Sequence, residues 1–317
     1  MKANPIELAN YKGLKAKKRG LKVDGKEINN ALNYLQQSRA KIITINEPAY
    51  RGAQVEIDFE IRQTGVKIED GGSRNHPLIL GEGRFLPGFE ENLVGMKAGE
   101  EKEFSLKAPA DWGDKRIAGK NLEIKVKMNI VQKRELPEIN DEFAKSLGKF
   151  NSLDILKKNI EEGLMQEKEL VEKQRIRIEL IEKVADDSKI DLPEELVNRE
   201  TETMLEELKF SIKQFGLDFE TYLNQIKASV EDLKKGWKKQ AEKRAKIGLC
   251  LKAIADKEGI NVENEEVEQK INGNLKRYNN VERVKKDIDL NALKEYTKNI
   301  IINEKVFELL EREAEII

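Results

Sequence analysis

The sequence has very few of the residues from which metal centres and nucleophilic active sites are built. It contains one cysteine, Cys250, and one histidine, His76. One cysteine cannot form an intrachain disulfide, and one histidine cannot assemble a transition-metal cage or a histidine-based triad. We expect Cys250, in an apolar stretch, to be a small buried hydrophobe and His76 to lie in an exposed loop. No metal site is expected.

Nucleotide-binding motifs are incomplete. The glycines in 81–84 are followed neither by the Gly-Lys-Ser/Thr of a phosphate-binding loop nor by the rest of a dinucleotide fingerprint. We therefore expect no cofactor.

An excess of charge of one sign and long apolar runs are also missing. Lysine and arginine number 58 and aspartate and glutamate 59, which gives a formal net charge of −1. A dedicated nucleic-acid binder would carry a basic excess, so no specific nucleic-acid partner is expected. No apolar run reaches the roughly 18 residues of a membrane span, and no signal-like segment follows Met1. We expect a cytoplasmic protein without a membrane partner.

Proline is scarce in the second half of the chain. Six of the seven prolines lie at or before Pro137, and Pro193 is the only one that follows. Because proline disrupts helix interiors, this asymmetry predicts a long helical C-terminal region. We divide the chain into an arm at 1–47, a compact domain at 48–134 and a helical domain at 135–317, and expect the arm to pack on the helical domain.

Helical periodicity is the main signal in the arm and in the helical domain. Asp24 and Glu27 have capping-box spacing just before apolar residues at i, i+3, i+4 and i+7, which predicts a helix in the arm. A break is expected at 186–193. The helices expected after it are 194–216, 219–256 with a break or bend near Gly236, 262–278 and 290–317.

The compact domain combines strand patterns with one short helix. Alternating apolar residues predict strands at 55–61, 103–107 and 122–131. Between the first two, Pro87 fits a first helical turn, Glu90 and Glu91 fit the positive end of a helix dipole, and Gly95 fits the helix end. The predicted fold class is α+β, a mostly antiparallel sheet with one short helix, joined to a separate all-α domain of long helices.

The segment that contains this helix carries a family resemblance. Residues 80–100 read LGEGRFLPGFEENLVGMKAGE and resemble the central segment of FKBP-type prolyl isomerases. The similarity continues through the APADWG stretch that begins at Ala108 and into the strand at 122–131. Downstream, 133–148 read KRELPEINDEFAKSLG, which is similar to the junction that leads into the helical domain of trigger factors. Residues 6–47 resemble the interdomain arm of that family.

The resemblance implies a folding chaperone with prolyl-isomerase activity. Its partners would be unfolded or nascent polypeptides and X-Pro peptides. The family's ribosome-docking domain, with a loop that reads GFRxGKxP, has no counterpart here, so we expect folding activity without ribosome tethering. The helical domain would hold clients on apolar patches. Side chains that would suit such a surface, though such residues more often form core, are Met165, Met204, Phe210, Phe215, Phe219 and Trp237.

Two alternatives stand beside this interpretation. The first is a non-catalytic peptide-binding or scaffolding protein with a degenerate isomerase domain. The second is a periplasmic parvulin-type chaperone, which the lack of a signal-like segment and of paired histidine and cysteine disfavours.

Carried over position by position, the resemblance implies an apolar pocket. Phe89 would form the floor beneath the proline ring, and Glu69, or Asp70 beside it, would supply a polar group at the rim. Ile68 and Ile124 stand where the family often has aromatic residues, so the activity is expected to be weak. The complete set assigned to the pocket is Phe59, Ile68, Glu69, Phe85, Leu86, Phe89, Trp112 and Ile124.

Such a pocket suits the chemistry of prolyl isomerisation. Rotation about an X-Pro bond faces a barrier of roughly 18–20 kcal/mol, mostly lost amide resonance, and needs no nucleophile. The twisted amide has less charge separation than the planar one, so an apolar, water-poor pocket favours it. Aromatic and aliphatic side chains are therefore the residues that this reaction requires.

Overall fold

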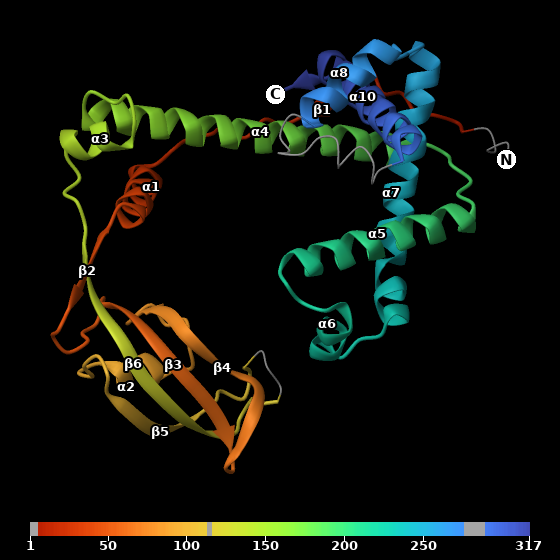
Figure 1. The fold of residues 1–317 in the computed structure, drawn as a ribbon. Coiled ribbons are helices and arrows are strands. Elements are labelled where there is room, and N and C mark those ends of the chain that lie inside the picture. Colours follow the sequence, from red (N-terminus) through yellow and green to blue (C-terminus); the bar gives the residue numbers. More distant parts are fainter. Residues whose placement is uncertain (1–5, 113–115, 276–288) are drawn as a thin grey trace. The chain divides into compact units, whose positions relative to one another are not determined.

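The computed structural model describes residues 6–112, 116–275 and 289–317, apart from the side chains of Asp70 and Asn274. Contacts divide the chain into two compact units, which are described separately (Figure 1). The helical unit comprises Met1–Leu21 and Gln166–Ile317, and the sheet unit comprises Lys22–Met165. The domain boundaries near residues 47 and 134 stay predictions.

The sheet unit is built on an antiparallel sheet. Its described strands are β2 Lys41–Ile45, β3 Gln54–Gln63, β4 Val66–Ile79, β5 Glu101–Lys107 and β6 Asn121–Glu135. They follow the order β2-β6-β3-β4, and β5 also pairs with β6. The first half of β6 pairs with β5 and its last residues pair with β2. The three predicted strands and the antiparallel arrangement are confirmed.

The periodicity did not predict two strands of the sheet, β2 and β4. The reason is clearest for β4. It contains Gly71, Gly72 and Pro77, which weaken a strand pattern and remove a ladder donor. Its register with β3 also shifts twice, which breaks the alternation of side chains on which strand prediction depends.

One face of the sheet packs against α2 Phe89–Leu93, the predicted short helix. Gly88 precedes it with φ 89°, a left-handed conformation that glycine adopts without strain. Alternate residues of β6 are fully or almost fully buried, from Leu122 to Met128. Together with α2 they form one continuous hydrophobic core.

The predicted arm helix is confirmed as α1 Gly25–Ser38. The Glu27 backbone N–H donates to Asp24 Oδ1 at 2.8 Å, and the Asp24 N–H donates to Glu27 Oε2 at 3.0 Å. This reciprocal pair satisfies two donors at the helix start. The helix buries Leu32 within the sheet unit, in a cluster with Phe143.

Helices make up most of the chain after residue 140. They are α3 Asp141–Leu147, α4 Leu153–Asp187, α5 Glu194–Gln214, α6 Phe219–Ile226, α7 Val230–Glu258, α8 Asn264–Leu275 and α10 Leu290–Glu313. The boundary between the units falls within α4. None of the described helices combines the length and apolar content needed to cross a membrane.

The predicted break before Pro193 is confirmed, but the break or bend predicted near Gly236 is misplaced. Gly236 lies inside α7, and the chain instead breaks after α6 at Lys227, whose φ is 53°. Ser229 and Asp232 then form a capping box that starts α7. An isolated glycine costs a helix only about 1 kcal/mol, whereas a capping box fixes a helix start. The end of the helix predicted at 262–278 lies outside the described residues.

The start of the arm and the chain end meet in the helical unit. Strand β1 Lys15–Ala16 pairs in parallel with β7 Glu315–Ile316. The helix predicted to reach Ile317 therefore ends at Glu313. Tyr11 and Ala16 are buried in a core that also contains residues of α4, α7 and α10.

Candidate functional site: an aromatic cluster in the sheet unit

Aromatic rings gather at one end of the sheet-unit core. Phe85 and Phe89 are stacked, with ring centroids 4.4 Å apart and planes 16° from parallel. Phe59 lies edge-on to both, at 5.3 Å from Phe85 and 5.9 Å from Phe89. Phe104 approaches Phe89 edge-on at 5.9 Å. Offset-stacked and edge-to-face contacts are the favourable arrangements of aromatic pairs, so the cluster holds its rings in defined positions.

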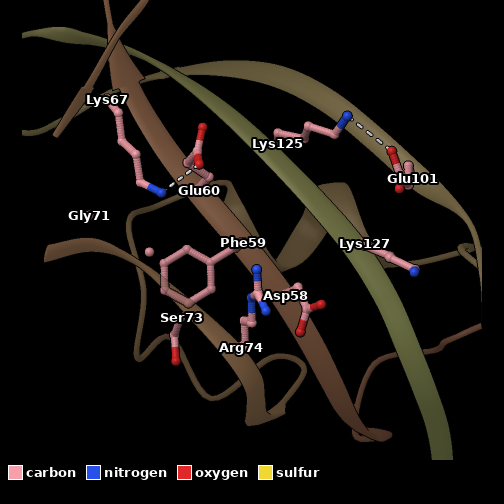
Figure 2. Close-up of a pocket in the computed structure, with 11 residues that line it drawn as sticks. Asp58, Phe59, Glu60, Lys67, Gly71, Ser73, Arg74, Glu101, Lys125 and Lys127 are labelled. Atoms are coloured by element: carbon pink, nitrogen blue, oxygen red, sulfur yellow. Dashed lines mark ion pairs between the residues drawn. The ribbon is translucent and has the colours of Figure 1, made fainter. Parts of the chain in front are cut away.

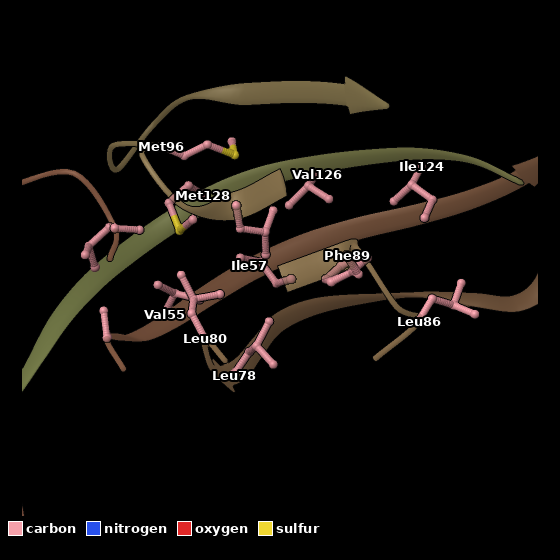
Figure 3. Packing of buried hydrophobic residues seen from close by; sticks show 14 of the residues in the cluster. Val55, Ile57, Leu78, Leu80, Leu86, Phe89, Met96, Ile124, Val126 and Met128 are labelled. Carbon is pink, nitrogen blue, oxygen red and sulfur yellow. The ribbon is translucent and has the colours of Figure 1, made fainter. Parts of the chain in front are cut away.

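Seven of the eight residues that the sequence assigned to the pocket belong to one hydrophobic cluster. Those seven are Phe59, Ile68, Phe85, Leu86, Phe89, Trp112 and Ile124. Leu86, Phe89 and Ile124 are buried, and the other four are half-buried. Figure 3 shows Leu86 and Ile124 near Phe89, at the end of the core away from Met128. Their proximity is observed, and their role in catalysis stays a prediction.

The predicted polar rim is less well defined. Glu69 is exposed, and its backbone carbonyl accepts a hydrogen bond from Arg116 Nη1 at 3.4 Å. The side chain of Asp70 lies outside the described part of the structure. The structure therefore does not place the side chain of either residue against the aromatic rings.

The predicted floor of the pocket is covered. Phe89 has 0% of its surface exposed. Half-buried Phe85 lies on one face of its ring. A proline ring can therefore contact Phe89 only after a neighbouring side chain moves, and Phe85 is the stacked neighbour that reaches the surface.

His76 corrects an expectation from the sequence. It does not lie in an exposed loop but in β4, where it is half-buried. Its ring lies edge-on to Phe59 at 5.6 Å and to Phe85 at 5.3 Å. The error follows from the unrecognised strand. The alternation of His76 with Leu78, which is buried, is the signal that could have placed it on the inward face.

Glu90 is a second residue whose role the sequence did not reveal. It is only 4% exposed and accepts hydrogen bonds from the backbone N–H groups of Gly81 (2.6 Å), Gly83 (3.0 Å) and Arg84 (2.8 Å). Burial raises the pKa of this carboxyl, but the backbone donors, which stabilise the carboxylate, lower it further, so its pKa lies below the usual value. Glu90 thus anchors the loop that carries Phe85.

A hollow of about 570 Å³ lies beside Phe59 (Figure 2). Its walls are mainly charged, and they include the ion pairs Lys67–Glu60 at 2.7 Å and Lys125–Glu101 at 3.0 Å. Among the described side chains, Phe59 is the one member of the predicted pocket in its lining. This polar hollow therefore differs from the apolar pocket that the sequence implied.

The described residues hold no group of three or more histidine, cysteine, aspartate or glutamate side chains that could bind a metal. Cys250 is fully buried, as expected, and burial raises the pKa of its thiol. A thiol with a raised pKa is a poor nucleophile at neutral pH.

The helical unit presents a second candidate surface. Phe210 and Phe215, at the end of α5, are 65% and 80% exposed, and Leu217 and Ile226 follow at 45% and 41%. Helix α6 buries none of its residues. Of the other side chains singled out from the sequence, Met204 is buried and Trp237 is half-buried. Large apolar side chains exposed close together in sequence are typical of an interaction surface.

The sheet with its short helix and aromatic cluster defines an FKBP-type prolyl-isomerase domain, and comparisons with known proteins agree. Residues 46–130 match the family of FKBP-type peptidyl-prolyl cis-trans isomerases. Residues 152–311 match the C-terminus of the bacterial trigger factor protein. The chain belongs to the trigger factor family.

Individual relatives support this assignment. The chain is 36% identical to the trigger factor of Carboxydothermus hydrogenoformans, over 89% of this chain and 66% of the relative. It is 33% identical to that of Caldicellulosiruptor saccharolyticus, over 98% and 71%. For that of Halothermothrix orenii the identity is 36%, over 96% and 72%. The chain therefore spans about two thirds of the length of these relatives.

A solved structure supports the fold. It comes from a study of promiscuous substrate recognition in folding and assembly activities of the trigger factor chaperone. The similarity has a TM-score of 0.55 at 24% identity and covers 97% of this chain and 73% of that one.

Proposed function

We propose that this chain is a folding chaperone that isomerises X-Pro bonds at the aromatic cluster and holds unfolded or nascent polypeptides on the exposed side chains of α5 and α6. The single observation that best supports the enzymatic half is the meeting of Phe59, Phe85 and Phe89 within an FKBP-type domain. The exposure of Phe210 and Phe215 supports the binding half.

In the proposed mechanism the enzyme acts by binding the twisted amide better than the planar one. The proline ring lies against Phe89 after Phe85 rotates away, with Phe59 and His76 at the sides. These apolar and aromatic walls exclude water, which favours the less polar twisted state. Glu90 contributes by holding the loop of Phe85 in place. No proton transfer to or from a side chain is required.

A protease-coupled assay on a short X-Pro peptide tests the enzymatic half. We expect Phe89→Leu, which keeps the core apolar but removes the ring, to lower kcat/KM by about tenfold. Met128→Leu, a volume-conserving change at the other end of the same core, is the matched control and should retain the parent kcat/KM. A folded Phe89→Leu protein as active as the parent would reject the pocket assignment.

Aggregation of a chemically denatured enzyme tests the binding half. Light scattering after dilution should be suppressed by this protein at stoichiometric concentration. The chaperone proposal fails if scattering is the same with and without it.

One observation favours the non-catalytic alternative, a peptide-binding module. Because Phe89 is fully covered and Phe85 stacks on it, the floor is closed to a proline ring in this conformation. Under this alternative the parent binds X-Pro peptides without accelerating their isomerisation. The variant Phe85→Ala distinguishes an isomerase from a peptide-binding module. It uncovers Phe89, which should change the isomerisation rate if the pocket is catalytic and leave it unchanged if the pocket only binds.

A further inference from the structure

A second hollow in the sheet unit is rich in arginine. It encloses about 770 Å³ and lies between α1, the turn that follows β2, the loop that follows β4 and the end of β6. Arg51, Arg84 and Arg134 line it, together with Tyr34 from α1 and Leu136. Glu82 is the single acidic residue in the part of the lining that the structure describes, so these walls carry an excess of positive charge. The whole chain, in contrast, has a net charge of −1.

Two of these arginines are not neutralised by carboxylates. Arg84 forms an ion pair with Glu82 at 2.7 Å. Within the described residues, neither Arg51 nor Arg134 forms an ion pair, and Arg134 Nη2 instead donates to the backbone carbonyl of Gln37 at 3.4 Å. Their guanidinium groups therefore retain donors for a ligand.

The same two arginines are held by the fold. A Cβ atom added to Gly81 would lie only 2.7 Å from Arg51 Cγ and 2.9 Å from its Nε, so the Arg51 side chain packs directly on this glycine. Glu90 in turn fixes the backbone of Gly81 through the 2.6 Å hydrogen bond described above. Arg134 is half-buried on β6. An arginine whose stem is already ordered loses less entropy when it binds.

We propose that this hollow binds an acidic segment of a polypeptide. The planar guanidinium forks of Arg51 and Arg134 suit bidentate contacts with carboxylates. Tyr34 and Leu136, which are 76% and 41% exposed, offer contacts to apolar residues between those carboxylates. The choice of a polypeptide as the occupant rests on the proposed chaperone function. Binding in this hollow does not depend on isomerase activity.

A single-stranded nucleic acid fits these observations less well. Its phosphates carry one negative charge per nucleotide, and such binding relies on an extended positive surface. Here Glu82 lies within the lining, and the chain as a whole carries a net charge of −1. An acidic peptide brings fewer charges and more apolar surface.

Fluorescence anisotropy with the full chain tests the proposal. The probes are two labelled nine-residue peptides without proline, Gly-Glu-Leu-Glu-Ala-Glu-Leu-Glu-Gly and the same peptide with glutamine at each glutamate. At low ionic strength we expect the acidic probe to bind about tenfold more tightly than the amide probe. The double variant Arg51→Gln, Arg134→Gln should bind both probes equally. Arg74→Gln removes one charge from the lining of the other hollow and should keep the preference.

Three results would overturn the proposal. The first is equal binding of both probes by the parent, and the second is an unchanged preference for the acidic probe in the correctly folded double variant. The third is a loss of that preference in Arg74→Gln as large as the loss in the double variant. Tighter binding of a nine-nucleotide uridine strand than of the acidic probe, with the same dependence on Arg51 and Arg134, would replace the peptide by nucleic acid. Because the probes contain no proline, a failed isomerase assay leaves this test intact.

Discussion

The sheet unit and the helical unit use their large apolar side chains in opposite ways. Around the sheet, one continuous core covers Phe89 completely and half-buries Phe59 and Phe85, and a smaller cluster surrounds Leu32 elsewhere in the unit. In the helical unit the described apolar residues form separate clusters, and Phe210 and Phe215 remain outside them. A closed aromatic cluster can select a ring of defined shape, whereas exposed apolar side chains can contact many sequences.

The difference has a geometric cause. A sheet directs every second side chain to one face, so β3, β4 and β6 fill a single layer with α2. A helix buries only the stripe that faces a partner. Helix α5 lies against α7 (Figure 1). Helix α6 buries none of its residues, and Phe210 and Phe215 remain exposed.

The largest contrast should come from truncating a phenylalanine in each unit. Phe89→Ala removes a fully buried ring and should lower the free energy of unfolding of the sheet unit by about 3–5 kcal/mol. Phe215→Ala, at an 80% exposed position, should change that of the helical unit by less than about 0.5 kcal/mol. The two tryptophans, Trp112 and Trp237, lie in different units, so urea titrations of single-tryptophan variants report each unit separately. A similar loss of unfolding free energy in both variants would contradict this contrast between the two units.

The helical unit has its own buried polar centre, which predicts the next largest effect. Arg177 is 2% exposed and donates to Glu311 at 2.9 Å and to Glu304 at 3.0 Å. Burial lowers the pKa of Arg177, but the two carboxylates raise it further, so it stays charged. Arg177→Ala should lower the free energy of unfolding by about 2–3 kcal/mol, because Glu304 loses its partner and Glu311 keeps only Lys173, at 3.7 Å. Lys173→Ala, an exposed neighbour, is the control, and equal losses would contradict the role of burial.

Glu90→Gln tests whether the loop of Phe85 must be fixed. It weakens the acceptor for three backbone donors and should lower the free energy of unfolding by about 1–2 kcal/mol and reduce kcat/KM. Glu91→Gln, at the exposed neighbouring position, should do neither. Unchanged activity in a folded Glu90→Gln protein would reject its positioning role.

The same carboxylate predicts a pH dependence. Because the pKa of Glu90 is lower in the folded protein than the usual 4.5, its contribution to stability is complete above pH 4.5. That contribution is lost as the pH falls through the folded pKa. Urea titrations from pH 7 to pH 3 should therefore show a steeper loss for the parent than for Glu90→Gln. If the free energies of unfolding of the parent and of Glu90→Gln fell equally with pH, Glu90 would not be the source of the pH dependence.

The smallest effect on stability should accompany the largest effect on client binding. The double variant Phe210→Ser, Phe215→Ser changes two exposed side chains and should alter the free energy of unfolding by less than about 1 kcal/mol. It should nevertheless suppress aggregation of a denatured enzyme less well than the parent. Tyr296→Ser, 65% exposed on α10, serves as the control. Equal suppression by all three proteins would remove α5 and α6 from the client surface.

The sequence by itself determined the elements whose signals are local. The reciprocal spacing of Asp24 and Glu27 defined α1, alternation defined β3, β5 and β6, and the lack of proline defined the helical region. Each depends on residues close together in the chain. The capping box at Ser229 is also a local signal, and it fixes the start of α7, whereas the helix tolerates Gly236 in its interior.

Only the tertiary structure decided how the candidate site is closed. Strand β4 exists because β3 pairs with it, and this pairing brings His76 to Phe59 and Phe85. The stacking of Phe85 on Phe89, the anchoring of the loop by Glu90 and the packing of Arg51 on Gly81 join residues through space. Residue types can suggest that these side chains belong to a site, but their distances depend on how distant segments pack, which no local pattern encodes.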